Sequence, residues 1–336
     1  MKIAIHHRRK GFSQGWIDYC IKNNIDYKIV NCYSNNIISE VSDCDALMWH
    51  YHSGSPKDVL FAKQLLFSLE AAGKRVYPNS LTNWHFNDKL GQKYLLEAVN
   101  GALVPTYVFY SKVDALNWIK ETTLPKVFKL RGGSSSENVR LIKSRKSAIK
   151  IINRAFGRGF SQYNKWGSLK ERIRRYRSGS AKFEEVLAGI GRFIIPVPYS
   201  NIIGKDRGYV YFQDFIPNNS HDIRVAYVFN KCFASRREVR PGDFRASGSG
   251  VSDMDMSKIP NKAIKIAFKV SKRLGLQTAA FDFVINNGEV LIVEMSYCFA
   301  YPPDQFSYGF WDENINYNPG PIDPFGWMVE GLLNDS

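Results

Sequence analysis

Near residue 290, two acidic residues lie in segments that are otherwise apolar. Asp282 stands inside one β-branched and aromatic run, and Glu294 comes late in a second run, two residues before Ser296. The Asn-Asn-Gly sequence at 286–288 predicts a β-hairpin, and residues two apart on a strand share a face. Because acids in apolar strands are costly unless they are paired or bind a metal, these three residues are candidate ligands for Mg²⁺ beside a phosphate. The alternative is a solvated hairpin with ordinary surface acids.

Glycine and serine fill the loop at 131–136, directly after an apolar strand predicted over 126–130. Glycine lets backbone N–H groups approach a phosphate closely, and serine adds hydrogen-bond donors. Lys129, at the end of that strand, could reach a phosphate covered by the loop, and Lys89 is a second candidate. A flexible surface loop would have the same composition, and the Walker A pattern is absent.

A third group of polar residues follows an aromatic strand that begins at 209. The segment 213–217 leaves this strand with alternating apolar and polar residues, so its backbone N–H and C=O groups could pair with an adenine edge. Arginines come next, and arginine suits bidentate contact with phosphate or carboxylate. They are Arg224, Arg236, Arg237 and Arg245. Each could equally form a surface ion pair.

Composition places the chain among globular proteins. Its 336 residues are 44% hydrophobic and 14% aromatic, which allows two or three small domains or one large α/β domain. No apolar run reaches the roughly 18–20 residues of a membrane span, and the first residues lack the apolar segment of a signal peptide. The five cysteines form no CxxC pair, so we expect a reduced, cytoplasmic protein.

The net charge of +15 is unevenly distributed. Residues 140–207 contain 17 Lys and Arg against 4 Asp and Glu. This segment is either a solvated basic face or a docking surface for an anion, such as a polyanionic glycan, a nucleotide-linked sugar or a membrane leaflet. Nucleic acid is disfavoured as a partner, because the aromatic residues here form no base-stacking series.

The order of strand and helix signals along the sequence predicts that the chain has three parts. Strand and helix signals alternate over 1–80, which indicates a small parallel sheet of Rossmann type. Residues 81–216 form a central part with the loop at 131–136, a basic insertion at about 154–205 and a helix at about 168–187. Residues 217–336 contain further strands, a helix at 258–274, the hairpin and an aromatic tail.

Taken together, these motifs resemble the ATP-grasp superfamily in their order and spacing, over about residues 75–300. Within it, the chain is similar to carboxylate–amine ligases of the ribosomal-protein glutamate ligase and D-alanine–D-alanine ligase type. The resemblance implies an α/β protein, α+β in its ATP-binding part, with an N-terminal Rossmann-like domain before the ATP-grasp fold. It also implies ATP and Mg²⁺ as cofactors.

The resemblance assigns a role to each matching residue. The residues implied to bind ATP are Lys89, Lys129, Ser134, Ser135, Ser136, Gln213, Asp214, Phe215, Ile216 and Asp222. The lysines and serines would contact phosphates, the segment 213–216 adenine, and Asp222 the ribose. The implied catalytic residues are Arg245, Arg224 and Arg236, and the implied metal ligands are Asp282, Glu294 and Ser296. The family commonly has Asn where this chain has Ser296, and a hydroxyl is a weaker Mg²⁺ ligand than an amide oxygen.

The chemistry implied is ATP-dependent activation of a carboxylate as an acyl phosphate, followed by attack of an amine. A sugar acid of a bacterial surface polysaccharide is the carboxylate we favour, with an anionic acceptor and an amine co-substrate as partners. We also consider a homodimer. An amino-acid or peptide ligase is the alternative enzyme, and a non-catalytic ATP-binding module is the alternative from another class.

Overall fold

The structure is a computed structural model. It describes residues 1–9, 11–133, 138–162, 182–194, 204–239, 252–299 and 307–334, together with 167, 169, 172–174, 176 and 244. No helix in these ranges combines the length and the apolar character that a bilayer span requires.

The first part is a parallel four-stranded sheet in the order β2-β1-β3-β4, as the alternation of signals predicts. Its strands are β1 (Lys2–His6), β2 (Asp26–Val30), β3 (Ala46–Met48) and β4 (Arg75–Tyr77). The helices among and after them are α1 (Ser13–Lys22), α2 (Ile37–Glu40), α3 (Pro56–Ala71) and α4 (Ser80–Asn83). Helix α3 begins where Ser55 accepts the Asp58 N–H and Pro56 takes the first position, both of which favour a helix start.

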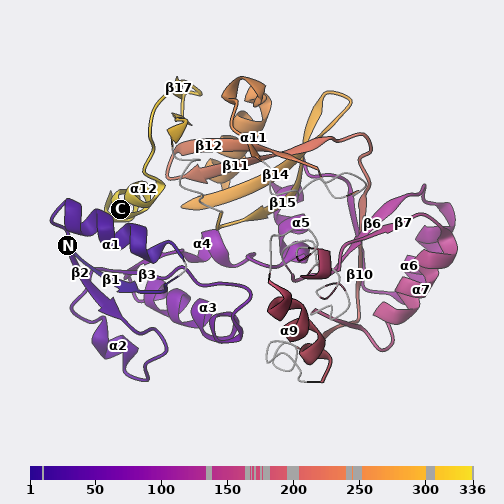
Figure 1. The fold of residues 1–336 in the computed structure, drawn as a ribbon, viewed down its shortest axis with the longest axis horizontal. Helices are drawn as coiled ribbons and strands as arrows, with labels where there is room; N and C mark the ends of the chain where they lie inside the picture. The colour runs from indigo at the N-terminus through magenta and orange to yellow at the C-terminus, as the bar shows by residue number, and fades with distance from the viewer. Residues whose placement is uncertain are drawn as a thin grey trace.

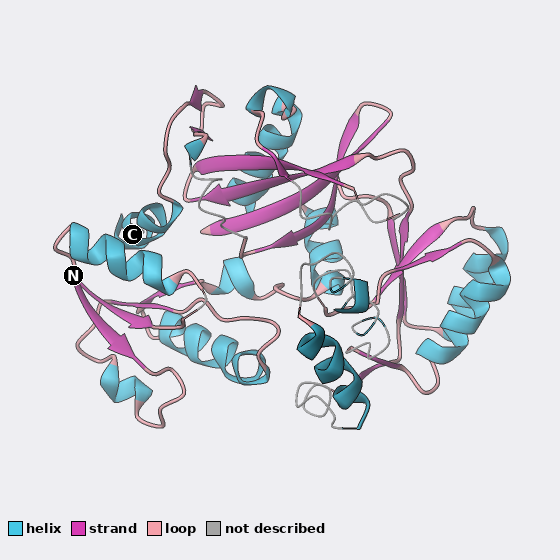
Figure 2. Ribbon diagram, in the orientation of Figure 1, coloured by secondary structure: helices cyan, strands magenta, loops and turns pink. Residues whose placement is uncertain are grey.

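The middle part is an antiparallel sheet in the order β5-β10-β6-β7. Its strands are β5 (Thr106–Phe109), β6 (Lys126–Lys129), β7 (Arg140–Ile142) and β10 (Val210–Asp214). Helices α6 (Lys112–Glu121) and α7 (Arg145–Ala155) cover its outer face and share one hydrophobic core with it (Figure 2). Helix α5 (Lys89–Ala98) lies between this sheet and the third one (Figure 1).

The basic segment departs from the expectation of one helix at about 168–187. Much of that range lies outside the described residues, but Lys182 is not helical, and α9 runs from Phe183 to Ile194, beyond the predicted end. The segment also contributes β8 (Phe160–Ser161), which pairs with β9 (Lys205–Asp206). Local apolar periodicity was therefore a poor guide to the helix bounds in a stretch this rich in charge.

The third part is a sheet in the order β15-β14-β11-β12-β16-β17, with β13 also beside β12. Its elements are β11 (His221–Val228), β12 (Lys231–Glu238), β13 (Ser252–Asp253), a 3₁₀ turn (Met256–Lys258), α11 (Asn261–Leu274), β14 (Thr278–Asn286), β15 (Glu289–Ser296), β16 (Phe310–Trp311) and β17 (Tyr317–Asn318). Strands β14 and β15 form the predicted hairpin. Helix α11 packs on one face of this sheet, where its Phe268 shares a hydrophobic core with Phe281 and Phe283 of β14.

The opposite face of this sheet is apolar at one end of the strands and charged at the other. Ala226, Val228 and Ala280 belong to the core of the first part. Asp222, Arg224 and Asp282 lie further along the same face, because strand residues two apart share a face. One face therefore anchors the sheet at one end and carries charged groups at the other.

The last helix, α12 (Pro324–Asn334), returns to the first part and lies beside α1 (Figure 1). Its residues Met328, Val329 and Leu332 complete the core around β1 and β3. The Trp16 indole Nε1 lies 3.3 Å from the Met328 sulfur. The parallel sheet thus depends on a helix that is distant in sequence.

This packing gives a stability prediction. Leu332 is 1% exposed, so Leu332→Ala should lower the free energy of unfolding by about 2–5 kcal/mol through lost transfer energy and a cavity. Chemical denaturation measures the loss. Leu60→Ala is the control, because Leu60 is 45% exposed on α3 and its loss should matter little. Equal effects of the two substitutions would contradict the role of α12.

Candidate active site

Lys129 marks the point where the middle and third sheets meet. It ends β6 and is buried. Its Nζ donates to the Gln213 Oε1 at 2.6 Å, and it lies 3.5 Å from the Val293 carbonyl oxygen of β15. The Gln213 side chain itself is 3.4 Å from the same carbonyl. A buried ammonium is thus held at a junction of three strands.

Lys89 joins the glycine-containing loop to the third sheet. Asp88 caps α5 by accepting the N–H groups of Leu90 and Gly91, which places Lys89 in the first turn. Its Nζ donates to the Gly133 carbonyl at 2.9 Å and lies 3.0 Å from Glu294 Oε1. Of the two predicted phosphate-contacting lysines, Lys89 therefore pairs with Glu294, and Lys129 reaches the backbone of the preceding residue on the same strand. Ser134, Ser135 and Ser136 lie outside the described residues.

The two predicted carboxylate ligands face each other across the hairpin. Asp282 of β14 is in direct register with Glu294 of β15, and a bulge follows this pair. Residues directly opposite in an antiparallel pair lie on the same face. Ser296 shares that face two residues on, but its Oγ accepts the Cys298 N–H at 3.2 Å.

Two arginines hold Asp282. Arg224 donates from Nε and Nη2 at 2.7 and 2.8 Å, and Arg237 lies 3.0 Å away. Burial alone would raise the pKa of Asp282, but these guanidinium groups outweigh it and hold the pKa below its ordinary value. Asp282 is therefore ionised in the folded protein.

Asp222 also pairs with Arg237. Burial, and next the negative charge of Asp282, raise the pKa of Asp222 to about 7, even though Arg237 and Arg224 oppose the shift. The Asp222 carboxylate pairs with Arg237 in this structure. Its implied contact with the ribose stays a prediction. The sequence marked Arg237 as suited to bidentate contact but assigned it no catalytic or ligand role; the structure places it on the same face as Phe233 and Ser235, opposite Asp222.

The structure does not bring the other predicted site residues that it describes into this cluster. Arg236 is on the opposite face of β12 and pairs with Glu238 at 3.2 Å. Asp214 pairs with Lys126 at 2.5 Å, and its N–H donates to the Pro105 carbonyl at 2.9 Å. Phe215 and Ile216 are half-buried after β10. Arg245 lies outside the described residues, and the catalytic and adenine-binding roles remain predictions.

An open cavity of about 550 Å³ adjoins the loop on the side of the first sheet. Its lining includes Tyr51, Lys63, Asp88, Arg131 and Arg207. It lies next to the helix that carries Lys89, so a molecule bound there would be near the lysine and carboxylate cluster.

Comparisons with known proteins support the predicted ATP-grasp fold. A family model described as a RimK-like ATP-grasp domain matches residues 200–298. A RimK-domain ATP-grasp protein from Sphaerobacter thermophilus superposes with a TM-score of 0.58 at 14% identity, covering 99% of this chain and 100% of that one. The D-alanine–D-alanine ligase of Bacillus anthracis, solved with ATP, gives 0.54 at 13% identity, covering 99% and 96%. The chain has the ATP-grasp fold.

A curated relative adds sequence similarity over a shorter stretch. A probable alpha-L-glutamate ligase of Coxiella burnetii is 32% identical over 89 residues, which is 26% of this chain. The match spans 30% of that relative's length. The predicted fold class is confirmed, and the match to the RimK-like domain model lies in the part of the chain that contains β11, β14 and β15.

The cluster of Lys89, Lys129, Asp282 and Glu294 contains oxygen ligands that suit Mg²⁺. Proteins usually hold this ion with one or two carboxylates, while phosphates and water complete the shell. Asp282 and Glu294 supply two facing carboxylates. Among the described residues, no group of three or more His, Cys, Asp or Glu side chains could hold a metal ion alone. The metal would therefore depend on the nucleotide for most of its ligands.

The protonation state of Lys129 leads to a prediction about ATP binding. Burial lowers the pKa of Lys129 to about 8, with the Lys89 charge adding to the shift and Glu294 and Asp282 opposing it. A bound polyphosphate favours the charged ammonium, so ATP binding near pH 8 should take up a fraction of a proton, and affinity should fall as the pH rises through 8. Calorimetry in buffers of different ionisation enthalpy measures the uptake. The same uptake in Lys129→Met would contradict the assignment.

Proposed function

We propose that this ATP-grasp protein is an ATP- and Mg²⁺-dependent ligase that joins a carboxylate to an amine. The observation that carries the proposal is the meeting of Lys89 and Lys129 with the facing pair Asp282 and Glu294. Cations that bind phosphate and carboxylates that hold a metal are the parts that phosphoryl transfer requires.

The reaction proceeds in two steps. A carboxylate oxygen of the substrate attacks the γ-phosphorus of ATP, the bond to the ADP oxygen breaks, and an acyl phosphate forms. The amine nitrogen then attacks the acyl carbon, inorganic phosphate leaves with the C–O bonding electrons, and the nitrogen loses a proton. An amide, ADP and phosphate are the products.

The side chains of the cluster have separate tasks in this scheme. Lys89 and Lys129 bind the phosphate oxygens and neutralise their charge, and Arg224 keeps Asp282 ionised and oriented. Asp282 and Glu294 would hold Mg²⁺, which when bound stabilises charge on the transferred phosphoryl group. Arg245 and the serines of the loop have their roles from the resemblance, and Ser296 is a third, weaker ligand.

For the substrates, we propose a sugar acid or glycan intermediate of a bacterial surface polysaccharide, coupled to an amino acid or another amine. The excess of Lys and Arg over 140–207 suits an anionic acceptor. A second candidate is an amino-acid or peptide ligase, which the similarity to a probable alpha-L-glutamate ligase favours. All five cysteines are free thiols, in keeping with our proposal of a cytoplasmic reaction.

The proposal is tested by a screen for ADP release. Uronic acids, nucleotide sugars and amino acids are offered as carboxylates, each with and without an amine, at saturating ATP and Mg²⁺. ADP formation that requires both a carboxylate and an amine supports a ligase, and the active carboxylate separates the two substrate candidates. ATP binding without turnover on any pair would favour the non-catalytic module.

A further inference from the structure

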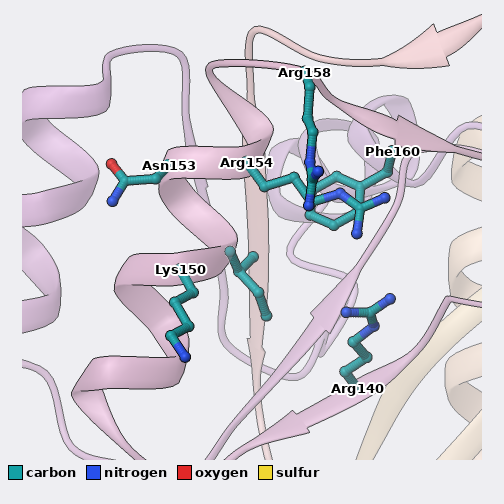
Figure 3. A pocket seen from close by; sticks show the side chains of 7 residues that line it. Arg140, Lys150, Asn153, Arg154, Arg158 and Phe160 are labelled. Carbon is teal, nitrogen blue, oxygen red and sulfur yellow. The ribbon is translucent and has the colours of Figure 1, made fainter.

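A second group of cations lies on the middle sheet, away from the lysines of the active site. Arg140 comes from β7, Lys150 and Arg154 from α7, and Arg158 from the turn that follows. With Phe160 they line an open pocket of about 610 Å³ (Figure 3). No carboxylate is among the described residues of this lining.

The sheet separates this pocket from the active site. Lys129 points to the third sheet, whereas the neighbouring Phe128 packs on Phe160, with ring centroids 5.0 Å apart. Adjacent strand residues point to opposite faces, so the pocket lies on the α7 side of the sheet. It therefore cannot share a phosphate with Lys129.

Arg154 is built into the wall of this pocket. Its Nε donates to the Gly159 carbonyl at 3.0 Å, and its guanidinium lies 4.4 Å from the centre of the Phe160 ring. Arg140 approaches the same ring at 5.9 Å. Burial first, and then the charges of Arg158 and Arg140, lower the pKa of Arg154, which is the sign of like charges gathered without a counterion.

The other three cations are exposed, and none forms an ion pair with the residues that the structure describes. Figure 3 shows Arg140, Arg154 and Arg158 with Phe160 in the lining of the pocket, while Lys150 projects from α7. Like charges held together raise each other's energy, and an anion that binds among them removes the repulsion. Arginine forks suit the oxygens of phosphoryl and carboxylate groups.

We propose that this pocket is a second anion site, which binds a multiply charged organic anion that carries phosphoryl or carboxylate groups. The volume exceeds that of one inorganic phosphate, and four cations call for more than one negative charge. The site is independent of the proposed nucleotide chemistry, so either proposal can fail alone.

The test is calorimetric titration with two probes, citrate and inorganic tripolyphosphate, in low-salt buffer without Mg²⁺. The pocket variant is Arg140→Gln, Lys150→Gln, Arg158→Gln, which leaves Arg154 in place because it holds Gly159. The control variant is Lys265→Gln, Lys269→Gln, Arg273→Gln, three exposed cations of α11 with the same total charge. Thermal unfolding checks that both variants are folded.

We expect at least one probe to bind the unchanged protein. The pocket variant should raise its dissociation constant about tenfold or more, since charge-assisted contacts with the anion are lost. The control should change it less than about twofold. Preference for citrate or for tripolyphosphate identifies carboxylate or phosphoryl ligands. No binding of either probe, or equal losses in the two variants, would overturn the proposal in favour of diffuse surface charge.

Discussion

Glu294→Gln is expected to reduce turnover by on the order of a hundredfold or more while the protein stays folded. The substitution keeps the shape of the side chain and removes the charge that lies 3.0 Å from Lys89 and opposite Asp282. That charge would help to hold Mg²⁺ where the phosphoryl group is transferred. ADP release with the substrates found in the screen measures the effect, and excess Mg²⁺ should restore little of it.

Glu289→Gln provides a matched control for this prediction. Glu289 begins the same strand, but its side chain is exposed and pairs with Lys262 on the surface. Its substitution should leave turnover within about twofold, since surface ion pairs contribute little. Full turnover in Glu294→Gln would contradict the proposal that Glu294 is a metal ligand. Asp282→Asn is a less clean probe, because it also leaves Arg224 and Arg237 partly unpaired and should destabilise the fold.

Lys129→Met is expected to weaken ATP binding about tenfold or more, since a charge-assisted hydrogen bond to phosphate is lost. Methionine fills much of the same buried volume, so the junction of the sheets should survive. Titration calorimetry with ATP and Mg²⁺ measures the affinity. The prediction rests on the position of Lys129 Nζ between Gln213 and β15.

Lys93→Met is the control for this second prediction. Lys93 is on α5, four residues after Lys89, and it pairs with Glu97 rather than with the cluster. ATP affinity should stay within about twofold of the unchanged protein. If Lys129→Met bound ATP as tightly as Lys93→Met does, the nucleotide phosphates would have to lie elsewhere.

Local patterns were sufficient to predict the main elements and part of the cluster. Alternating strand and helix signals predicted the parallel sheet, and the Asn-Asn-Gly turn predicted the hairpin that carries the two carboxylates. The β-bulge that brings Glu294 opposite Asp282 was not predicted. These features depend on neighbours within about ten residues, which a sequence displays directly.

Which side chains face one another across paired strands was not predictable in the same way. Whether Arg236 or Arg237 faces Asp282 depends on the register of β12 against β11, and a shift of one residue reverses the answer. Likewise, Lys126 is the first residue of β6 and Lys129 the last. Only the packing of α6 shows that Lys126 lies on the face of the middle sheet that is turned away from Lys129, over Tyr107 and Trp118. Such choices depend on contacts between elements, which the pattern within one strand does not determine.

The return of α12 to α1 has a consequence for how this protein is made. Trp16, Met328 and Leu332 share one core, so the first sheet to leave the ribosome lacks part of its own interior until the final helix has been synthesised. During that interval the apolar side chains of β1 and β3 would stay partly uncovered, a state that is prone to aggregation and attracts chaperones. For the same reason, a fragment cut off after the first sheet should be a poor candidate for separate expression.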